Sequence, residues 1–262
     1  MRVQFACPNP LPYLLLSISC FAGLLNQAAA DDNNPASEIR QALVAADRGE
    51  HEKAIALLDG VIKLEAPPPY AYYLRGRELL RIGKIEASVA DLDQYVKLEP
   101  KSESRQWERG IAYYYAGKFA EGAKQFEIYQ TYHDQDVENS VWRYLCATKI
   151  NGVEKARANM LPIEHDSRIP MMEVFDLFRG KKTPDDVFTA AKAGTPNPAT
   201  LEMRLFYANL YVGLYYDSLG QMEKAREQIA LAAEHAHVAE YMGDVARVHA
   251  KHLKSLEKEA TK

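Results

Sequence analysis

Aromatic and basic side chains recur at matching places in two neighbouring segments, 34 residues apart in the chain. Tryptophan, tyrosine and arginine are common anchors of protein interfaces, and two arginines one helical turn apart can bind a carboxylate. We predict that these side chains line a groove that binds a protein or peptide. The alternative is that the rings pack inside the fold or beneath the chain's own C-terminal helices, with the arginines paired to nearby glutamates. The predicted groove residues are Tyr73, Arg77, Arg81, Trp107, Ile111, Tyr114 and Tyr115.

The chain lacks the residue patterns of common hydrolases. Neither G-x-S-x-G nor H-E-x-x-H occurs in the sequence. A hydrolase is a remote alternative, based on Glu164, His165 and Asp166, which follow one another in a predicted loop. Three adjacent polar residues in a loop are usually solvated and carry no chemistry. We therefore predict that the protein is not an enzyme and uses no cofactor.

Histidines occur in two pairs towards the C-terminus. His235 and His237 stand beside Glu234, whereas His249 and His252 lie one helical turn apart. A zinc site requires three or four convergent ligands, and neither pair has an evident third ligand in the sequence. We predict no metal site.

The first thirty residues have the composition of a secretory signal peptide. Arg2 is their single charged residue, an apolar run follows over 11–25, and small residues precede the expected cleavage after Ala30. Residues 31–36 would then form a flexible mature N-terminus, and the protein would be periplasmic or secreted. The alternative is a membrane-anchored lipoprotein acylated at Cys20, although Ser17 stands where a lipobox usually has leucine.

Removal of residues 1–30 takes away one of 32 basic residues and leaves 31 against 36 acidic ones, a net charge of −5. This balance gives no support to nucleic-acid binding. Cys146 would be the single cysteine of the mature chain, so no internal disulfide can form. Its apolar surroundings predict a buried structural thiol.

Glycines repeat with the same 34-residue period as the aromatic residues. Gly76 precedes Gly110 by 34 positions, and Gly49, Gly83 and Gly117 form a second series with that spacing. The first series is expected inside helices that pack closely, and the second at helix ends that need a left-handed residue. This pattern is typical of the tetratricopeptide repeat (TPR), a helix–turn–helix unit that stacks into a solenoid. The predicted fold class is therefore all-α.

A single solenoid domain is expected over residues 37–258. Its fourth repeat is interrupted, because Pro162 cuts the second helix short. Two inter-repeat helices are expected within 171–193, with Thr183 and Pro184 starting the second one. A capping helix over 238–257 would cover the end of the stack. The predicted repeats are about 37–67, 69–102, 103–136, 137–163 and 199–237.

Three segments resemble the NlpI-like TPR proteins of the bacterial cell envelope, in the same order. They are ERGIAYYYAGKFAEGAKQFEIYQTYHDQDVENSVWRYLC, FDLFRGKKTPDDVFTAA and FYANLYVGLYYDSLGQMEKAREQIALAAEHAH. The resemblance implies a non-catalytic adaptor, often homodimeric, that brings a periplasmic protease to cell-wall hydrolases. The alternative is a structural envelope protein that self-assembles as a homodimer. The poor lipobox at Cys20 departs from the pattern of these lipoproteins.

Overall fold

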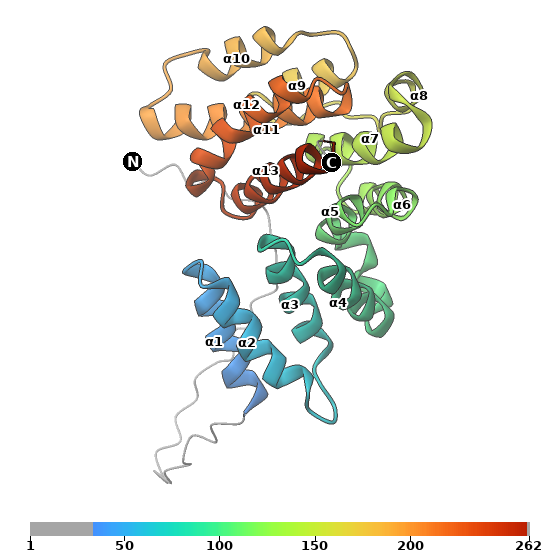
Figure 1. Cartoon of the computed structure of the whole chain (residues 1–262), viewed down its shortest axis with the longest axis vertical. Coiled ribbons are helices and arrows are strands. Elements are labelled where there is room, and N and C mark those ends of the chain that lie inside the picture. Colours follow the sequence, from blue (N-terminus) through green and yellow to red (C-terminus); the bar gives the residue numbers. More distant parts are fainter. Residues whose placement is uncertain (1–33, 261–262) are drawn as a thin grey trace, which may run out of the picture. The chain divides into compact units, whose positions relative to one another are not determined.

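A computed structural model describes residues 34–260, which are helical apart from turns and loops. Figure 1 shows successive helices folding back on one another, and no strand occurs within residues 34–260. The predicted cleavage site at Ala30, the alternative lipid site at Cys20 and residues 31–33 lie outside the described residues.

The first three hairpins have the helix–turn–helix form predicted from the 34-residue period. Three residues join the two helices of each hairpin, and a 3-10 helix, η1 (Pro100–Arg105), connects the second hairpin to the third. The first helix begins at Pro35, two residues earlier than expected, because proline is favoured in the first turn of a helix. The hairpins are α1 (Pro35–Asp47) with α2 (His51–Ile62), α3 (Pro69–Arg81) with α4 (Ile85–Leu98), and α5 (Trp107–Tyr115) with α6 (Phe119–Gln130).

The two helical glycines of repeats two and three mark the closest approach within each hairpin. A Cβ atom on Gly110 would lie 2.6 Å from Phe126 Cζ, and one on Gly76 would lie 2.8 Å from Leu92 Cγ. Both distances are shorter than carbon atoms normally approach, so the predicted role of these glycines is confirmed. Gly83 follows α3 with φ of +80°, the left-handed conformation predicted for the turn.

Three arginines, also spaced 34 residues apart, connect the hairpins in a ladder. Each one lies on the first helix of a repeat and reaches partners 16 residues before and 16 residues after it. The earlier partner belongs to the preceding repeat, and the later partner to the second half of the same repeat. We call these residues the arginine ladder: Arg75 binds Asp59 and Asp91, Arg109 binds Asp93 and Gln125, and Arg143 binds Glu127 and the carbonyl of Asn159.

The fourth repeat departs from the first three, as Pro162 predicts. Its first helix, α7 (Val137–Asn151), is long, whereas its second helix, α8 (Val153–Ala158), has six residues. The chain then runs back along α7, where the Ser140 hydroxyl donates to the Leu161 carbonyl over 2.8 Å.

Two short helices follow within the predicted range 171–193. They are α9 (Met171–Phe178) and α10 (Pro184–Lys192). The Thr183 side chain caps α10, and the Asp186 carboxylate accepts a hydrogen bond from the Thr183 backbone N–H.

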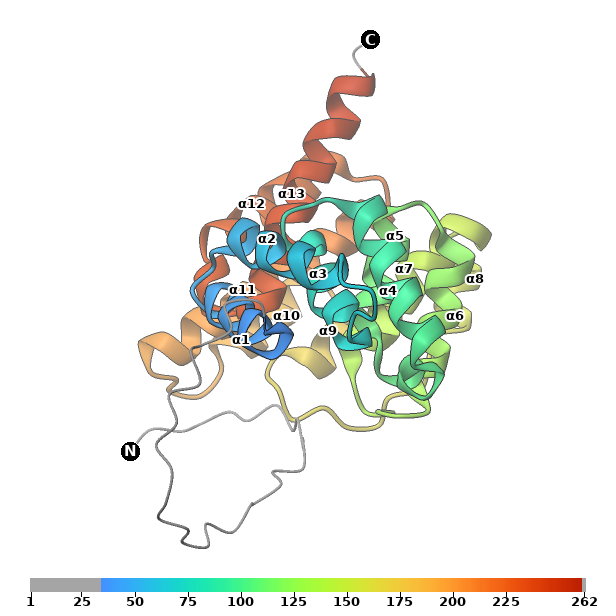
Figure 2. The same ribbon diagram turned by 90° about the horizontal axis from the view of Figure 1, so that it is seen from below.

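The last repeat is a full hairpin of α11 (Pro198–Ser218) and α12 (Met222–Glu234). A short 3-10 helix, η2 (Ala236–Val238), leads into α13 (Glu240–Ala260), the predicted capping helix. This helix packs on α12 and also reaches α3, which is distant in the sequence. Figure 2 shows its last turns extending beyond the other helices, where residues 254–258 are exposed.

Buried apolar side chains form two clusters. The larger cluster extends from α3 and α4 to α13, whereas the smaller one joins the first hairpin to α3. The smaller cluster is rich in alanine and therefore buries less apolar surface per residue. It consists of Ala42, Ala45, Ala54, Leu58, Val61, Ala71 and Leu74.

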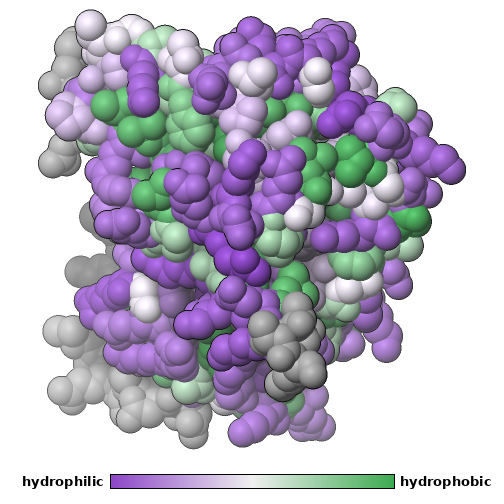
Figure 3. Space-filling view, turned by 45° about the horizontal axis from the view of Figure 1, so that its top comes forward, coloured by the Kyte–Doolittle hydropathy of each residue, from purple (hydrophilic) through white to green (hydrophobic). Residues whose placement is uncertain are grey.

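The face shown in Figure 3 is mostly hydrophilic, with hydrophobic residues in small groups between the polar ones. Within residues 34–260, no helix is both long enough and apolar enough to cross a membrane.

Candidate partner-binding face

The seven predicted groove residues all lie on α3 and α5, the first helices of repeats two and three. The repeat phase therefore placed them on the correct elements. The structure differs from the expected groove in what covers them, because α13 and α11 contribute side chains that these residues contact.

Glu108 lies at the centre of the α3 side of this face. Its side chain is 2% exposed, and its Oε1 atom lies 3.0 Å from Arg77 Nε and accepts a hydrogen bond from the Tyr73 hydroxyl at 3.1 Å. Burial raises the pKa of the Glu108 carboxyl above its ordinary value, and the Arg77 charge works in the opposite direction. This buried ion pair fixes the orientation of the guanidinium that α13 contacts.

Tyr241, at the start of α13, occupies the space between the two predicted arginines. The Arg77 guanidinium lies 4.9 Å from the ring centroid, and that of Arg81 lies 5.4 Å from it. The Trp107 ring lies nearly perpendicular to the Tyr241 ring, at a centroid distance of 5.0 Å. The Tyr241 hydroxyl donates to the Arg77 carbonyl at 3.2 Å, so hydrogen bonding as well as ring contact places this side chain.

Asp244 lies one helical turn after Tyr241 and faces the same surface. Its Oδ2 atom accepts from Arg81 Nε at 2.7 Å and lies 3.5 Å from His51 Nε2. The other ring nitrogen of His51 lies 2.7 Å from Glu78 Oε2, and Arg81 also pairs with Glu78. This network of charges connects α2, α3 and α13.

The α5 side of the predicted groove is buried at Ile111 and Tyr114 and half-buried at Trp107 and Tyr115. Ile111 is 1% exposed and Tyr114 is 3% exposed, so the expectation that these two residues line an open surface is wrong. The Tyr114 hydroxyl donates to Asp217 of α11 at 3.3 Å, and the Tyr115 hydroxyl lies 3.2 Å from His249 Nδ1. The physical reason is that large rings on a concave face gain more by packing against the later helices than by remaining in water.

The structure therefore matches the alternative to an open groove: the rings lie beneath the C-terminal helices, and the arginines pair with acidic residues. A partner-binding role for Tyr73, Arg77, Arg81, Trp107 and Tyr115 stays a prediction. Sequence reasoning did not find Glu108, Tyr241 and Asp244, because no periodic signal connects α13 with α3.

A cleft of about 470 Å³ opens beside this network, between the first hairpin, α3 and the start of α13. Its walls carry both signs of charge together with exposed apolar surface. We call it the α1–α13 cleft and define it by Leu43, Arg48, His51, Arg81, Glu240 and Asp244.

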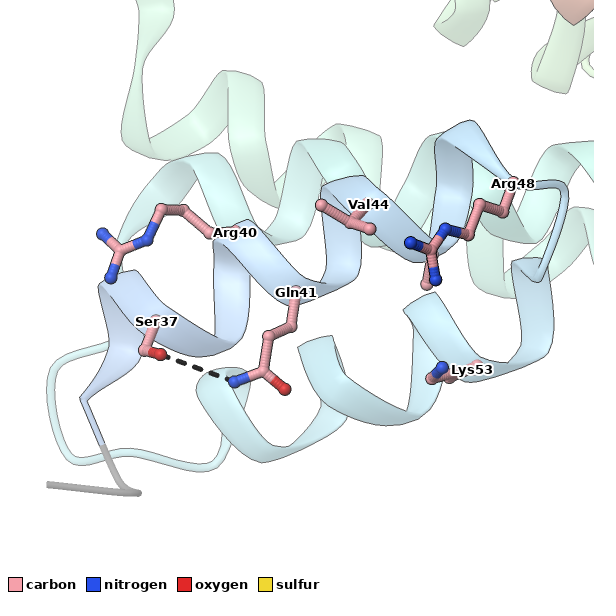
Figure 4. A pocket seen from close by; sticks show the side chains of 7 residues that line it. Ser37, Arg40, Gln41, Val44, Arg48 and Lys53 are labelled. Carbon is pink, nitrogen blue, oxygen red and sulfur yellow. Dashed lines mark hydrogen bonds between the residues drawn. The ribbon is translucent and has the colours of Figure 1, made fainter. Parts of the chain in front are cut away.

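A smaller hollow of about 270 Å³ lies on the outer side of the first hairpin. Figure 4 shows its side chains, including Arg40, Arg48 and Lys53 around Val44. Val44 is 50% exposed, so the outer face of α1 presents apolar surface bordered by positive charge.

The loop proposed for the hydrolase alternative is held by contacts within the fold. Gln135 Oε1 accepts from the backbone N–H groups of Glu164 and His165, both at 2.9 Å. The Asp166 carboxylate accepts from Arg168 and is directed at that residue rather than at the His165 ring. Asp166 and the backbone of this loop therefore take part in contacts that hold the loop in place.

The remaining sequence candidates have structural neighbours of their own. His235 Nδ1 and His237 Nε2 lie 2.9 and 3.3 Å from Glu202 Oε1. In the described part of the chain, no group of three or more potential ligands has an arrangement that holds a metal ion. Cys146 is fully buried and burial raises its pKa well above the ordinary value, which confirms the buried structural thiol.

Residues 69–102, which form α3, α4 and the start of η1, match the family model of the tetratricopeptide repeat. The chain is also similar to the crystal structure of a thermophilic TPR protein from Thermus thermophilus. That likeness has a TM-score of 0.44 and 15% sequence identity, and it covers 84% of this chain and 98% of that chain. The matched family segment is the second predicted repeat, so the assignment of that segment as a TPR is confirmed.

Proposed function

We propose that the chain is an exported, non-catalytic adaptor of the cell envelope that binds a protein partner at the α1–α13 cleft. TPR units typically form scaffolds with extended binding surfaces, because stacked hairpins expose side chains from several repeats on one face. The resemblance to NlpI-like proteins favours partners that are envelope proteases or cell-wall hydrolases.

The cleft itself is the observation that carries this proposal. Leu43 is 41% exposed at its edge, and Arg48 is exposed nearby. An apolar residue beside charged groups of both signs suits a polypeptide segment better than a small apolar ligand. The cleft also lies against the His51, Arg81 and Asp244 network, which holds its walls in a defined geometry.

Affinity capture from the native cell envelope tests the proposal. The bait is the full chain, compared with a variant that carries Leu43→Glu and Arg48→Glu at the edge of the cleft. The matched control carries Ile150→Glu and Lys155→Glu, because Ile150 is 50% exposed and Lys155 is exposed on α8.

We expect the cleft variant to recover at least tenfold less partner, and the control to recover as much as the unchanged chain. Equal recovery by all three baits would refute the cleft as the binding site. An alanine variant of Tyr73, Trp107 and Tyr114 is unsuitable for this purpose, since these rings pack within the fold.

A homodimer is the second candidate, favoured by the outer face of α1. Val44 is 50% exposed there, on the first hairpin of the stack, which has no described repeat on its outer side. Light scattering on residues 31–262 measures the oligomeric state, and Val44→Glu is the informative variant. A dimer that Val44→Glu converts to a monomer supports this candidate, whereas a monomer at all concentrations contradicts it.

A further inference from the structure

We infer that the leading turn of α13, residues 240–244, occupies a seat that also accepts a partner's helix, one that carries an aromatic residue and a carboxylate three positions later. The seat consists of His51, Arg77, Glu78, Arg81 and Trp107, the residues that surround Tyr241 and Asp244. The inference rests on the proposed adaptor function and specifies the kind of partner segment (Figure 1 shows α13 beside α3).

The first half of the seat selects an aromatic ring. Two guanidinium groups and the indole of Trp107 surround the Tyr241 ring, and cations attract the negative face of an aromatic system. An aliphatic side chain of similar size would fill the space but would lose this electrostatic attraction.

The second half of the seat selects a carboxylate. Arg81 Nε donates to Asp244 over 2.7 Å and His51 Nε2 lies 3.5 Å away, while the nearby Glu78 is already paired with both residues. A basic residue at the position of Asp244 would face the Arg81 charge and lose this hydrogen bond. Residues at positions i and i+3 share one face of a helix, so the seat fits a helical segment.

The fit of the leading turn leaves hydrogen-bonding capacity unused. Glu108 Oε2 is buried beside Arg77, and within the described residues it accepts no hydrogen bond. Burial of such a group without a partner is unfavourable, because the group has lost its hydrogen bonds to water. A partner helix with a hydroxyl or amide donor near its aromatic residue would satisfy Glu108, and would therefore compete favourably with the chain's own segment.

The leading turn also has features that favour its release. Glu240 has φ of +40°, which is a strained conformation for a residue with a Cβ. Gly243 lies within this turn and has a low helix propensity, which weakens the helix at this point. Unwinding of 240–244 leaves the rest of α13 in place, because Val245 and Leu253 remain packed in the large cluster.

A labelled peptide that copies residues 238–256 tests the inference by fluorescence anisotropy. The receptor is the full chain with Tyr241→Ala and Asp244→Ala, which removes the competing side chains from the seat. We expect this variant to bind the peptide at least tenfold more tightly than the unchanged chain does. Circular dichroism and a cooperative unfolding transition verify that the double variant is folded. If the double variant does not fold, the single variant Asp244→Ala serves as the receptor.

Two control peptides separate specific recognition from general helix binding. One has leucine in place of Tyr241 and the other lysine in place of Asp244, and each should bind at least tenfold more weakly. A receptor that also carries Arg81→Glu should reverse the second preference and favour the lysine peptide. Equal binding of all peptides, or no binding to the folded variant, would overturn the inference.

The outcomes also distinguish this inference from the adaptor function. Partner capture that depends on the cleft, together with failed peptide binding, retains the adaptor and removes the seat. Peptide binding without any captured partner would retain the seat and remove the adaptor function. A dimer of the unchanged chain that Tyr241→Ala abolishes would assign the seat to a second copy and would overturn its assignment to a partner.

Discussion

Glu108 and His249 are both fully buried titratable residues on the inner face, and they are held by different means. Glu108 has an ion pair with Arg77, so its charge is compensated within the fold. His249 contacts Tyr115 by a hydrogen bond and lies 3.6 Å from Asp217, but burial still disfavours its charged form. Individual residues on this face thus contribute to stability in ways that depend on pH.

Substitution of two helical glycines by alanine should have opposite effects. We expect Gly110→Ala to destabilise the fold by about 1–3 kcal/mol, because its Cβ overlaps the Phe126 ring. Gly60→Ala should be neutral or stabilising by up to about 1 kcal/mol, since it meets only the flexible end of Glu38 and improves helix propensity. Urea unfolding measures both, and equal effects would contradict the close approach of α5 and α6.

Acidification should weaken the fold through His249. Burial lowers the pKa of its imidazole from the ordinary 6.5 to about 4, with Asp217 opposing and His252 and Lys149 adding to the shift. Between these values the unfolded chain binds a proton that the folded chain does not, so stability falls as pH decreases from 6.5 to 4. The contribution is about 3 kcal/mol at most.

Urea unfolding at several pH values across this range checks the prediction. Burial raises the pKa of Glu108 and Glu138. These two carboxyls therefore make the fold more stable as pH falls, which opposes the effect of His249. The informative quantity is therefore the difference in pH dependence between the unchanged chain and His249→Gln. Identical pH dependences would show that His249 does not contribute.

At the level of elements, the arginine ladder explains how neighbouring hairpins keep a constant orientation. Each arginine contacts the second half of two successive repeats, so it fixes the position of one hairpin relative to the next. Arg109 is the middle member and pairs with Asp93, Glu103 and the buried Gln125. The ladder follows the same 34-residue period as the glycines, although the sequence-based predictions did not include it.

Replacement of Arg109 by alanine should lower the free energy of unfolding by about 1–3 kcal/mol, because it leaves the buried Gln125 amide oxygen without its donor. Asp93 loses its ion pair with Arg109 but still accepts a hydrogen bond from the Tyr113 hydroxyl. Arg105→Ala is the matched control, since this exposed arginine contacts the Tyr132 ring. We expect the control to change stability by less than about 1 kcal/mol. Thermal and urea unfolding measure both variants, and a similar loss in each would argue against the ladder.

On the scale of the whole molecule, the two apolar clusters predict uneven stability. The first hairpin depends on the small alanine-rich cluster and on the charges around His51, whereas α7 and α11 lie in the large cluster. Repeat proteins unfold in units that depend on contacts with their neighbours.

Native-state hydrogen exchange should therefore show less protection in α1 and α2 than in α7 and α11. Opening of the first hairpin breaks the small cluster but leaves the large one intact. The test variant is Asp244→Asn, which weakens the contact of α13 with His51 and Arg81. We expect it to reduce the hydrogen-exchange protection of α2 further. Uniform protection across these helices would contradict this separation.

Mass spectrometry of the mature protein tests the predicted export. We expect a chain that begins at Asp31 and carries no lipid, because small residues precede this position. A chain that begins at an acylated Cys20 would instead establish the lipoprotein alternative.

The sequence by itself determined the all-α class, the repeat phase and the interruption at Pro162. These features depend on local contacts, since a repeat touches mainly its neighbours and its residues recur with the period. The correct helices for Tyr73, Arg77 and Trp107 followed from that phase.

The tertiary structure alone decided what these residues contact. Tyr241 and Asp244 meet α3 across sequence separations of 164 and 163 residues, and no repeat relates α13 to the earlier hairpins. Once α13 packs on α12, its leading turn covers the arginines because burial of Tyr241 and pairing of Asp244 stabilise that position. The period therefore describes the scaffold, whereas long-range packing determines which part of its inner face is open to a partner.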